Sequence, residues 1–242
     1  MLRTSNPVLS EKALRSGASA VVTEAMTVEG AVNRSLISVV LTMGAAYWSY
    51  STPSLASMTM IFVIAGLVCA IVLSFKHSLA PLLTPVYAVV EGMALGSISL
   101  FADTQFPGIA FQAISLTFGV MFVMLIAYQT GFIKVTEKLR STVMIATVAI
   151  FAVYLINFIA SFFGASMSFL HDSSPLSIGI SVVVVGVAAF NLLLDFELIQ
   201  RLGNQGNQPK YMEWYGAFAL LVTLVWLYME MLRLLMKLQS RD

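Results

Sequence analysis

Long apolar stretches without charged residues recur along the whole chain, and they constrain its fold more than any other feature. About 20 helical residues span the roughly 30 Å hydrocarbon core of a bilayer. Helices are required, since unpaired backbone amides are too costly in hydrocarbon and a closed barrel would show ten-residue alternation instead. The sequence therefore predicts an all-α, polytopic membrane protein with seven transmembrane helices, at about residues 35–51, 55–75, 80–102, 108–133, 142–169, 176–200 and 211–237.

The composition excludes two broad classes of protein. Hydrophobic residues make up 59% of the 242 residues and charged residues 10%, whereas soluble domains are roughly half apolar and a quarter charged. A water-soluble enzyme fold is therefore excluded. The 13 Lys and Arg are almost cancelled by 12 Asp and Glu, for a net charge of +1, so the chain has no basic surplus for nucleic acid.

The chain divides into a polar N-terminal segment at 1–34, a transmembrane domain at 35–238 and a short tail at 239–242. The first segment has no apolar core followed by a cleavage site, so we expect no cleaved signal peptide. Basic residues occur before the first span and after the second, fourth and sixth, but not after the first, third and fifth. Since short cytoplasmic loops are enriched in Lys and Arg, this alternation predicts a multi-pass protein of the cytoplasmic membrane with a cytoplasmic N-terminus.

The basic tail conflicts with this alternation. Arg233, Lys237 and Arg241 would lie outside if the last segment crosses completely, and inside if it dips and returns. We favour crossing, because residues 217–227 contain no Gly or Pro to mark a turn in the membrane.

Acidic residues lie in or at the rim of the apolar spans, whereas Arg233 is the one base placed similarly. Ionisable groups at membrane depth cost at least about 2.5 kcal/mol on insertion scales, so they usually face a protein interior or an aqueous path. An excess of acids indicates cations or protons as the partners of the site. The acids are Glu91, Asp195, Glu197, Glu213 and Glu230.

Depth along the helices suggests which acids can meet. If the sixth helix ends near Leu202 and the seventh begins near Lys210, Asp195 and Glu213 lie at depths of roughly 10 and 5 Å from the same membrane surface. Two carboxylates that meet in a low dielectric share a proton, and at higher pH they form an oxygen-rich site that suits calcium. Asp195 and Glu213 are therefore the candidate proton sensor and calcium ligands, with a structural polar contact and an interfacial carboxylate as the respective alternatives.

Other polar residues are candidates for secondary roles. Asn191 lies one helical turn before Asp195 and shares its face. Glu91 begins a segment with Gly92 and Gly96, whose spacing permits close approach of another helix, and the acid serves either a pathway or packing.

The two remaining candidates lie near the far end of the last span. Glu230 is about 30 Å along the last helix, near the opposite surface from Glu213. It is three residues from Arg233, which favours a structural latch between them.

Enzymatic and metal-site motifs are missing. The sequence has neither HExxH nor GxSxG, and His77 and His171 lie in loops without a second cluster of ligands. We therefore expect no enzyme and no resident cofactor, with calcium as a transported or bound ion.

Several segments together resemble the bacterial branch of the transmembrane Bax-inhibitor-motif family, and the likeness covers nearly the whole chain. They are Ser5-Asn-Pro-Val-Leu9, Pro85-Val-Tyr-Ala-Val-Val-Glu91-Gly92, Asn191-Leu-Leu-Leu-Asp195-Phe-Glu-Leu-Ile199, Pro209-Lys-Tyr-Met-Glu213-Trp-Tyr215 and Leu224-Val-Trp-Leu-Tyr228-Met-Glu230-Met-Leu-Arg233-Leu-Leu235.

The resemblance implies a seven-helix fold with a central last helix and a pH-sensitive calcium leak governed by paired acids in the last two helices. Asp195 matches the acid of the sixth helix. The second acid aligns by motif with Glu230, whereas depth favours Glu213. Other members are linked to cell-death suppression and to modulation of membrane proteases, which implies the alternative of an interaction protein that conducts nothing.

Overall fold

The computed structural model describes residues 25–164 and 172–241, and within these ranges the fold is all-α, as predicted. The described residues form no strand beyond an isolated antiparallel bridge between Ala25 and Pro209. The helices are α2 (Val28–Tyr50), η2 (Pro53–Met58), α3 (Thr59–Phe75), η3 (His77–Leu79), α4 (Ala80–Gln105), α5 (Ile109–Gln129), α6 (Glu137–Ser161), α7 (Pro175–Gln205) and α8 (Met212–Gln239), where η marks a short 3₁₀ helix.

Six of the described helical segments are long and apolar enough to cross a membrane, by length and composition. The first segment combines η2 with α3, the second combines η3 with α4, and the other four are α5, α6, α7 and α8. The helix outside this set is α2, whose first turns carry Glu29 and Arg34. Its apolar remainder from Ser35 to Tyr50 is shorter than the roughly 20 residues that a span requires.

Two helix starts differ from the prediction because threonines cap them. Helix α2 begins at Val28 rather than near residue 35, since Thr27 accepts a hydrogen bond from the Gly30 amide at 2.9 Å. Helix α6 begins at Glu137 rather than near residue 142, since Thr136 accepts one from the Leu139 amide at 3.2 Å. This helix ends at Ser161, and residues 165–169 of the predicted span lie outside the described residues.

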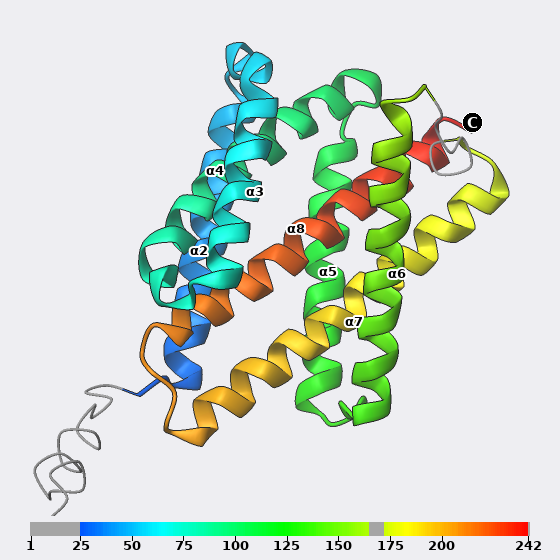
Figure 1. The fold of residues 1–242 in the computed structure, drawn as a ribbon. Coiled ribbons are helices and arrows are strands. Elements are labelled where there is room, and N and C mark those ends of the chain that lie inside the picture. Colours follow the sequence, from blue (N-terminus) through cyan, green and yellow to red (C-terminus); the bar gives the residue numbers. More distant parts are fainter. Residues whose placement is uncertain (1–24, 165–171, 242) are drawn as a thin grey trace, which may run out of the picture.

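Helix α8 runs obliquely between the group formed by α2, α3 and α4 and the group formed by α5 and α6 (Figure 1). It packs against α2, α4, α5 and α7. Of its most apolar 18-residue stretch, 61% is buried, which is the largest share among the six segments. The helix is unbroken from Met212 to Gln239. A segment that dips and returns is therefore contradicted.

Glycines of α4 bring it against α2. A Cβ atom added at Gly92 would lie 2.4 Å from the Thr42 carbonyl oxygen, and one at Gly96 would lie 2.1 Å from that of Ala46. Both distances are too short for any side chain, so the two backbones touch along a seam. The close approach predicted from the glycine spacing is confirmed.

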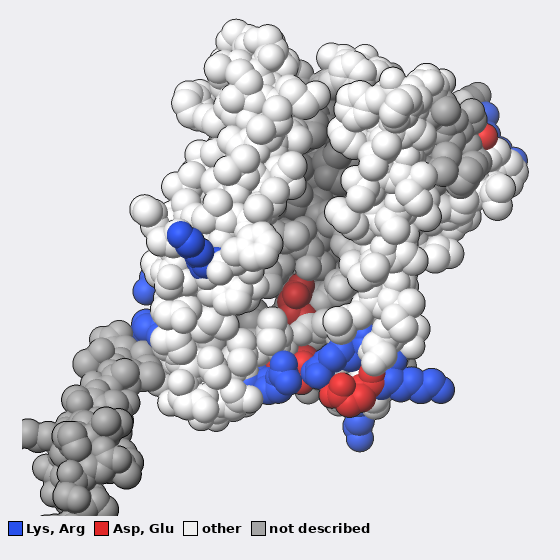
Figure 2. All heavy atoms as spheres, in the orientation of Figure 1, with Lys and Arg blue, Asp and Glu red and all other residues white. Residues whose placement is uncertain are grey.

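Most of the charged side chains on the visible face gather at its lower end, and the surface above them is largely uncharged, apart from basic side chains on the left and a few charged atoms at the upper right (Figure 2). The ion pairs of the described residues include those of Arg140 with Glu137 at 2.9 Å and with Glu197 at 2.6 Å. In the same view the face is hollowed between its two halves, and acidic atoms are recessed inside the hollow. The largely uncharged surface matches the belt that lipid would contact.

Candidate functional site

Asp195 lies within the membrane-length helix α7, ten residues before its end at Gln205. Its Oδ2 atom is buried and has no hydrogen-bond partner among residues 25–164 and 172–241. The hydroxyl of Thr223 on α8 faces the same carboxyl group. A buried carboxylate oxygen without a donor is costly, so Asp195 carries an unmet hydrogen-bonding requirement within the membrane-length helix.

Asn191 lies one turn before Asp195 and connects α7 to α6. Its side-chain Nδ2 donates to Thr147 Oγ1 at 2.8 Å and to the Val187 carbonyl at 2.9 Å. The amide that shares the face of Asp195 is thus oriented by α6.

Glu230 and Arg233 form the predicted pair on α8, and α6 completes it. The Glu230 side chain is 1% exposed, and Arg233 Nη1 donates to both carboxylate oxygens at 2.8 and 3.0 Å. Tyr154 of α6 donates its hydroxyl to Glu230 at 3.1 Å and accepts from Arg233 at 2.8 Å. The guanidinium also lies over the Tyr154 ring at 5.1 Å.

Lys237 extends these contacts towards the end of α8. Its Nζ donates to Ser181 Oγ at 2.8 Å and to the Ser177 carbonyl at 3.4 Å, both on α7. The side chain is 6% exposed. Two of the three basic residues of the tail segment are therefore held inside the bundle by polar partners.

These side chains form three groups of contacts between α6, α7 and α8, which together we call the polar track. Thr147 and Tyr154 are seven residues apart on α6, as are Thr223 and Glu230 on α8, so each pair lies on one helix face about 10 Å apart. The track therefore leads from Asp195 towards the α8 C-terminus. Its members are Thr147, Tyr154, Asn191, Asp195, Thr223, Glu230 and Arg233.

Glu213 lies outside the track, and the structure does not bring it together with Asp195. Its carboxylate is 1% exposed and accepts from the Thr27 amide and hydroxyl, both at 3.1 Å, with Lys210 Nζ at 3.4 Å. Asp195 faces Thr223, which lies ten residues, or about 15 Å, along α8 from Glu213. The depth estimate failed because α7 continues to Gln205, which moves Asp195 farther from the hairpin than a helix ending near Leu202 would.

One known protein family matches the sequence over a range that includes both the polar track and the contact between Thr27 and Glu213. A family model described as Bax inhibitor 1 like matches residues 6–240. The chain belongs to the Bax inhibitor 1-like family. Neither the curated proteins nor the solved structures contain a match to it. The resemblance seen in the sequence is thereby confirmed at the level of the family.

The two remaining candidate acids of this Bax inhibitor 1-like protein lie away from the track. Glu91 faces α3, where a Cβ atom at Gly66 would lie 2.3 Å from its Oε2. Glu197 points to the charged end and pairs with Arg140 at 2.6 Å and Arg201 at 3.9 Å. Asp195 and Glu197 thus point in different directions, although they are two residues apart on α7.

Sequence reasoning missed Thr147, Tyr154 and Thr223, because single hydroxyls are common in apolar helices. The seven-residue spacing of Thr147 and Tyr154 within the mainly apolar middle of α6 was the available signal. The described ranges contain no group of three or more His, Cys, Asp or Glu side chains that could hold a metal ion. A cation at this site would therefore rely on neutral oxygens and water in addition to Asp195.

Proposed function

We propose that this Bax inhibitor 1-like protein lets cations cross the membrane, as a pH-sensitive calcium leak channel or exchanger. The observation that carries the proposal is the buried Asp195 Oδ2 without a hydrogen-bond donor. A carboxylate at membrane depth takes up a proton or balances a cation, since otherwise its desolvation is uncompensated. Asp195 is thus the proton sensor, and protonation removes the charge that attracts the ion.

The polar track supports a path that starts at Asp195. The Thr223 hydroxyl lies beside the carboxyl group, and Asn191, which is bonded to the hydroxyl of Thr147, lies one helical turn away. Calcium takes six to eight oxygen ligands, with water completing the shell, so one carboxylate with neutral oxygens suits a weak, transient site. Calcium is cargo in this mechanism, and the protein needs no resident cofactor and catalyses no reaction.

The far end of the track provides the gate. While the pair is closed, Arg233 neutralises Glu230 and leaves it no free charge to attract a cation. Tyr154 offers its hydroxyl to both partners, so the pair can open by exchanging one hydrogen bond for another. Glu230 is therefore the second acid that the family motif suggested, acting through its latch with Arg233 at a distance from Asp195.

The topology that we propose has seven crossings, of which α2 is the first and the one with the shortest apolar part, its polar first turns lying at the membrane surface. It also has a central α8 and a cytoplasmic N-terminus in the bacterial inner membrane. The basic residues of the tail no longer argue against it, because Arg233 is neutralised by Glu230 and Lys237 is bound to Ser181. A reporter fused after residue 242 tests this topology, with a signal from the outer side expected. A cytoplasmic signal would overturn it.

Calcium flux into proteoliposomes between pH 6 and 8 tests the function. We expect flux above that of empty vesicles, rising with pH, and a fall of at least tenfold in Asp195→Asn with loss of the pH dependence. Glu197→Gln is the matched control, since this acid lies two residues away on α7 but faces the charged end. The proposal fails if Asp195→Asn and the parent conduct equally.

A non-conducting protein that modulates a membrane protease is the second candidate. The exposed apolar surface of α6 favours this second candidate, since only 6% of the most apolar 18-residue stretch of α6 is buried within the chain. That surface would contact either lipid or another membrane protein. Flux no higher than in empty vesicles at every pH would favour this candidate.

A further inference from the structure

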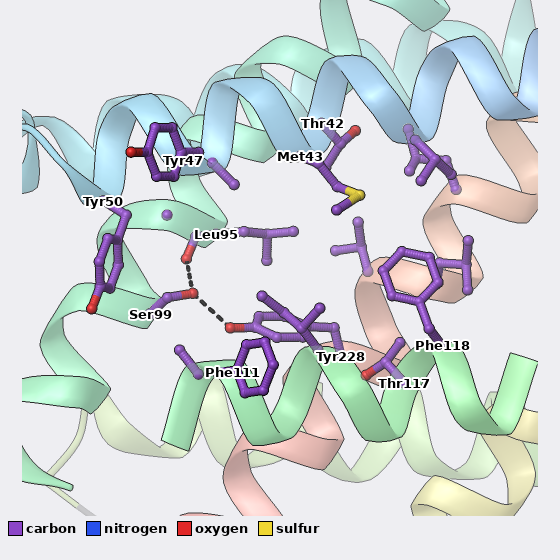
Figure 3. Close-up of a pocket in the computed structure, with 18 of the residues that line it drawn as sticks. Thr42, Met43, Tyr47, Tyr50, Leu95, Ser99, Phe111, Thr117, Phe118 and Tyr228 are labelled. Atoms are coloured by element: carbon purple, nitrogen blue, oxygen red, sulfur yellow. Dashed lines mark hydrogen bonds between the residues drawn. The ribbon is translucent and has the colours of Figure 1, made fainter. Parts of the chain in front are cut away.

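A cavity of about 410 Å³ opens between α2 and α5, on the side of α8 away from the polar track. In Figure 3, Thr42, Met43 and Tyr47 of α2 face Phe111 and Thr117 of α5 across the open space, and Tyr228 of α8 forms the floor. Helices α2 and α5 both pack against α4 and α8 but make few contacts with each other. The cavity is the gap that this arrangement leaves.

The mouth of the cavity faces the apolar belt. Tyr47 and Phe111 at its rim are 75% and 76% exposed, whereas Leu224 and Tyr228 inside it are each 6% exposed. Met43 of α2 and Ile114 of α5, which line the cavity farther from the helix ends, are also exposed, at 50% and 38%. The mouth therefore extends from the interface to the depth of the bilayer hydrocarbon.

The polar side chains deep in the cavity are already hydrogen-bonded within the described residues. Ser99 bonds the Tyr228 hydroxyl and the Leu95 carbonyl, each at 2.6 Å, and Tyr50 donates to Asp103 at 2.7 Å. Asp103 also accepts from the Ala110 amide at 2.9 Å. The hydroxyls of Thr42 and Thr117 are bonded to carbonyls of their own helices. An apolar occupant would therefore leave every hydrogen bond intact.

The length of the cavity matches the hydrocarbon thickness of one bilayer leaflet. The lining residues extend from Val39 to Tyr50 on α2 and from Ala110 to Phe118 on α5, or about 16 and 12 Å along the helices. Half of the hydrocarbon core is about 15 Å thick. The cavity ends at Tyr50 and Asp103, near the helix ends, where a headgroup would remain in the interface. Its volume lies in the range of about 300–1,000 Å³ that is typical of ligand pockets.

We propose that this cavity holds one acyl chain of a bilayer phospholipid. Asp103 is the one charged side chain among the described lining residues, and its negative charge disfavours the carboxylate of a free fatty acid at the same position. A phospholipid keeps its headgroup outside and inserts only hydrocarbon. The bound acyl chain fills the gap between α2 and α5 and packs on the floor formed by Tyr228. The proposal does not depend on ion conduction.

Photolabelling of the full-length protein tests the proposal. The protein is reconstituted in phosphatidylcholine vesicles that contain a phosphatidylcholine with a diazirine in its acyl chain, illuminated, and mapped by mass spectrometry. We expect adducts on Leu224 and Tyr228, which bulk lipid reaches only through the cavity. Adducts confined to outward residues, such as Val123 and Ile126 of α5, would overturn the proposal.

Variants that fill the mouth sharpen the test. Ile114→Trp on α5 and Met43→Trp on α2 narrow the cavity from opposite walls, and each should lower labelling of Tyr228 at least fivefold. Ile126→Trp is the matched control, since this residue faces lipid on the same helix but does not line the cavity. Labelling that is equal in all folded variants would contradict the proposal. Labelling of Tyr228 by photoreactive palmitate but not by the phospholipid would overturn the choice of ligand.

Discussion

The seam between α2 and α4 and the contact of α6 with α7 and α8 hold the bundle together by different means. At the seam, backbones touch at Gly92 and Gly96, and the contact is van der Waals packing. At α6, named hydrogen bonds from Thr147 and Tyr154 make the connection, and most of the helix surface is exposed. Packed glycines have one arrangement, whereas polar groups can exchange partners with water, protons or cations. We therefore expect α2 and α4 to form a fixed scaffold, and the contacts between α6, α7 and α8 to be the adjustable part of the bundle.

The largest effect is expected from breaking the buried ion pair. Arg233→Met leaves Glu230 charged and buried with Tyr154 as its remaining partner, and should lower the free energy of unfolding by about 3–5 kcal/mol. Adding Glu230→Gln to Arg233→Met removes the uncompensated charge and should restore at least half of that loss. Unfolding in detergent micelles measures both. A double variant less stable than the single one would show that α6 is held by something other than this pair.

The next effect concerns the seam. Gly96→Ala places a Cβ atom 2.1 Å from the Ala46 carbonyl oxygen, so α2 must move, at a cost of about 1–3 kcal/mol. Gly119→Ala on α5 is the control, since a Cβ atom there meets nothing within 4 Å. Equal thermal stability of the two variants would refute a rigid seam.

A smaller effect is expected at Glu213. Glu213→Gln keeps an oxygen that can accept from Thr27 but loses the charge beside Lys210, which should cost about 1 kcal/mol. Hydrogen exchange should accelerate at the first amides of α2, and the pH profile of calcium flux should be unchanged. Glu29→Gln, an exposed acid in the first turn of α2, is the control. A shifted flux profile would restore Glu213 as a proton sensor.

The smallest effect concerns the hydrogen bond between α6 and α7. Thr147→Val removes the acceptor of the Asn191 amide and should cost about 0.6 kcal/mol, the average for hydrogen bonds between membrane helices. Thr142→Val, at an exposed position one turn closer to the start of α6, should cost less. If Thr142→Val costs as much, α6 does not depend on its polar contact with α7.

The sequence predicted the helices and local relations well, because both follow from spacing along one chain. The pair of Glu230 and Arg233 and the seam glycines depend on offsets of three and four residues, which a helix converts directly into a shared face. The family resemblance was also correct, since its motifs extend along the whole chain.

Relations between helices were harder to predict. The proposed meeting of Asp195 and Glu213 depended on where α7 ends and how it aligns with α8. An error of three residues in the end of α7 shifts Asp195 by about 5 Å, and the antiparallel alignment placed Thr223 opposite it instead. The start of α2 was missed for a related reason, since the sequence does not reveal that Glu213, 186 residues later, fixes Thr27.

The contact between Thr27 and Glu213 has a consequence for biosynthesis. The ribosome makes α2 before every other described helix, yet the partners of its first turn, Glu213 and the Gln208 carbonyl that binds the Met26 amide, emerge near the end of translation. The beginning of the bundle therefore stays unfinished until its last helix is inserted. A nascent chain stalled before residue 208 would lack both of these partners, and the amides of Met26 and Thr27 would have to bond water instead.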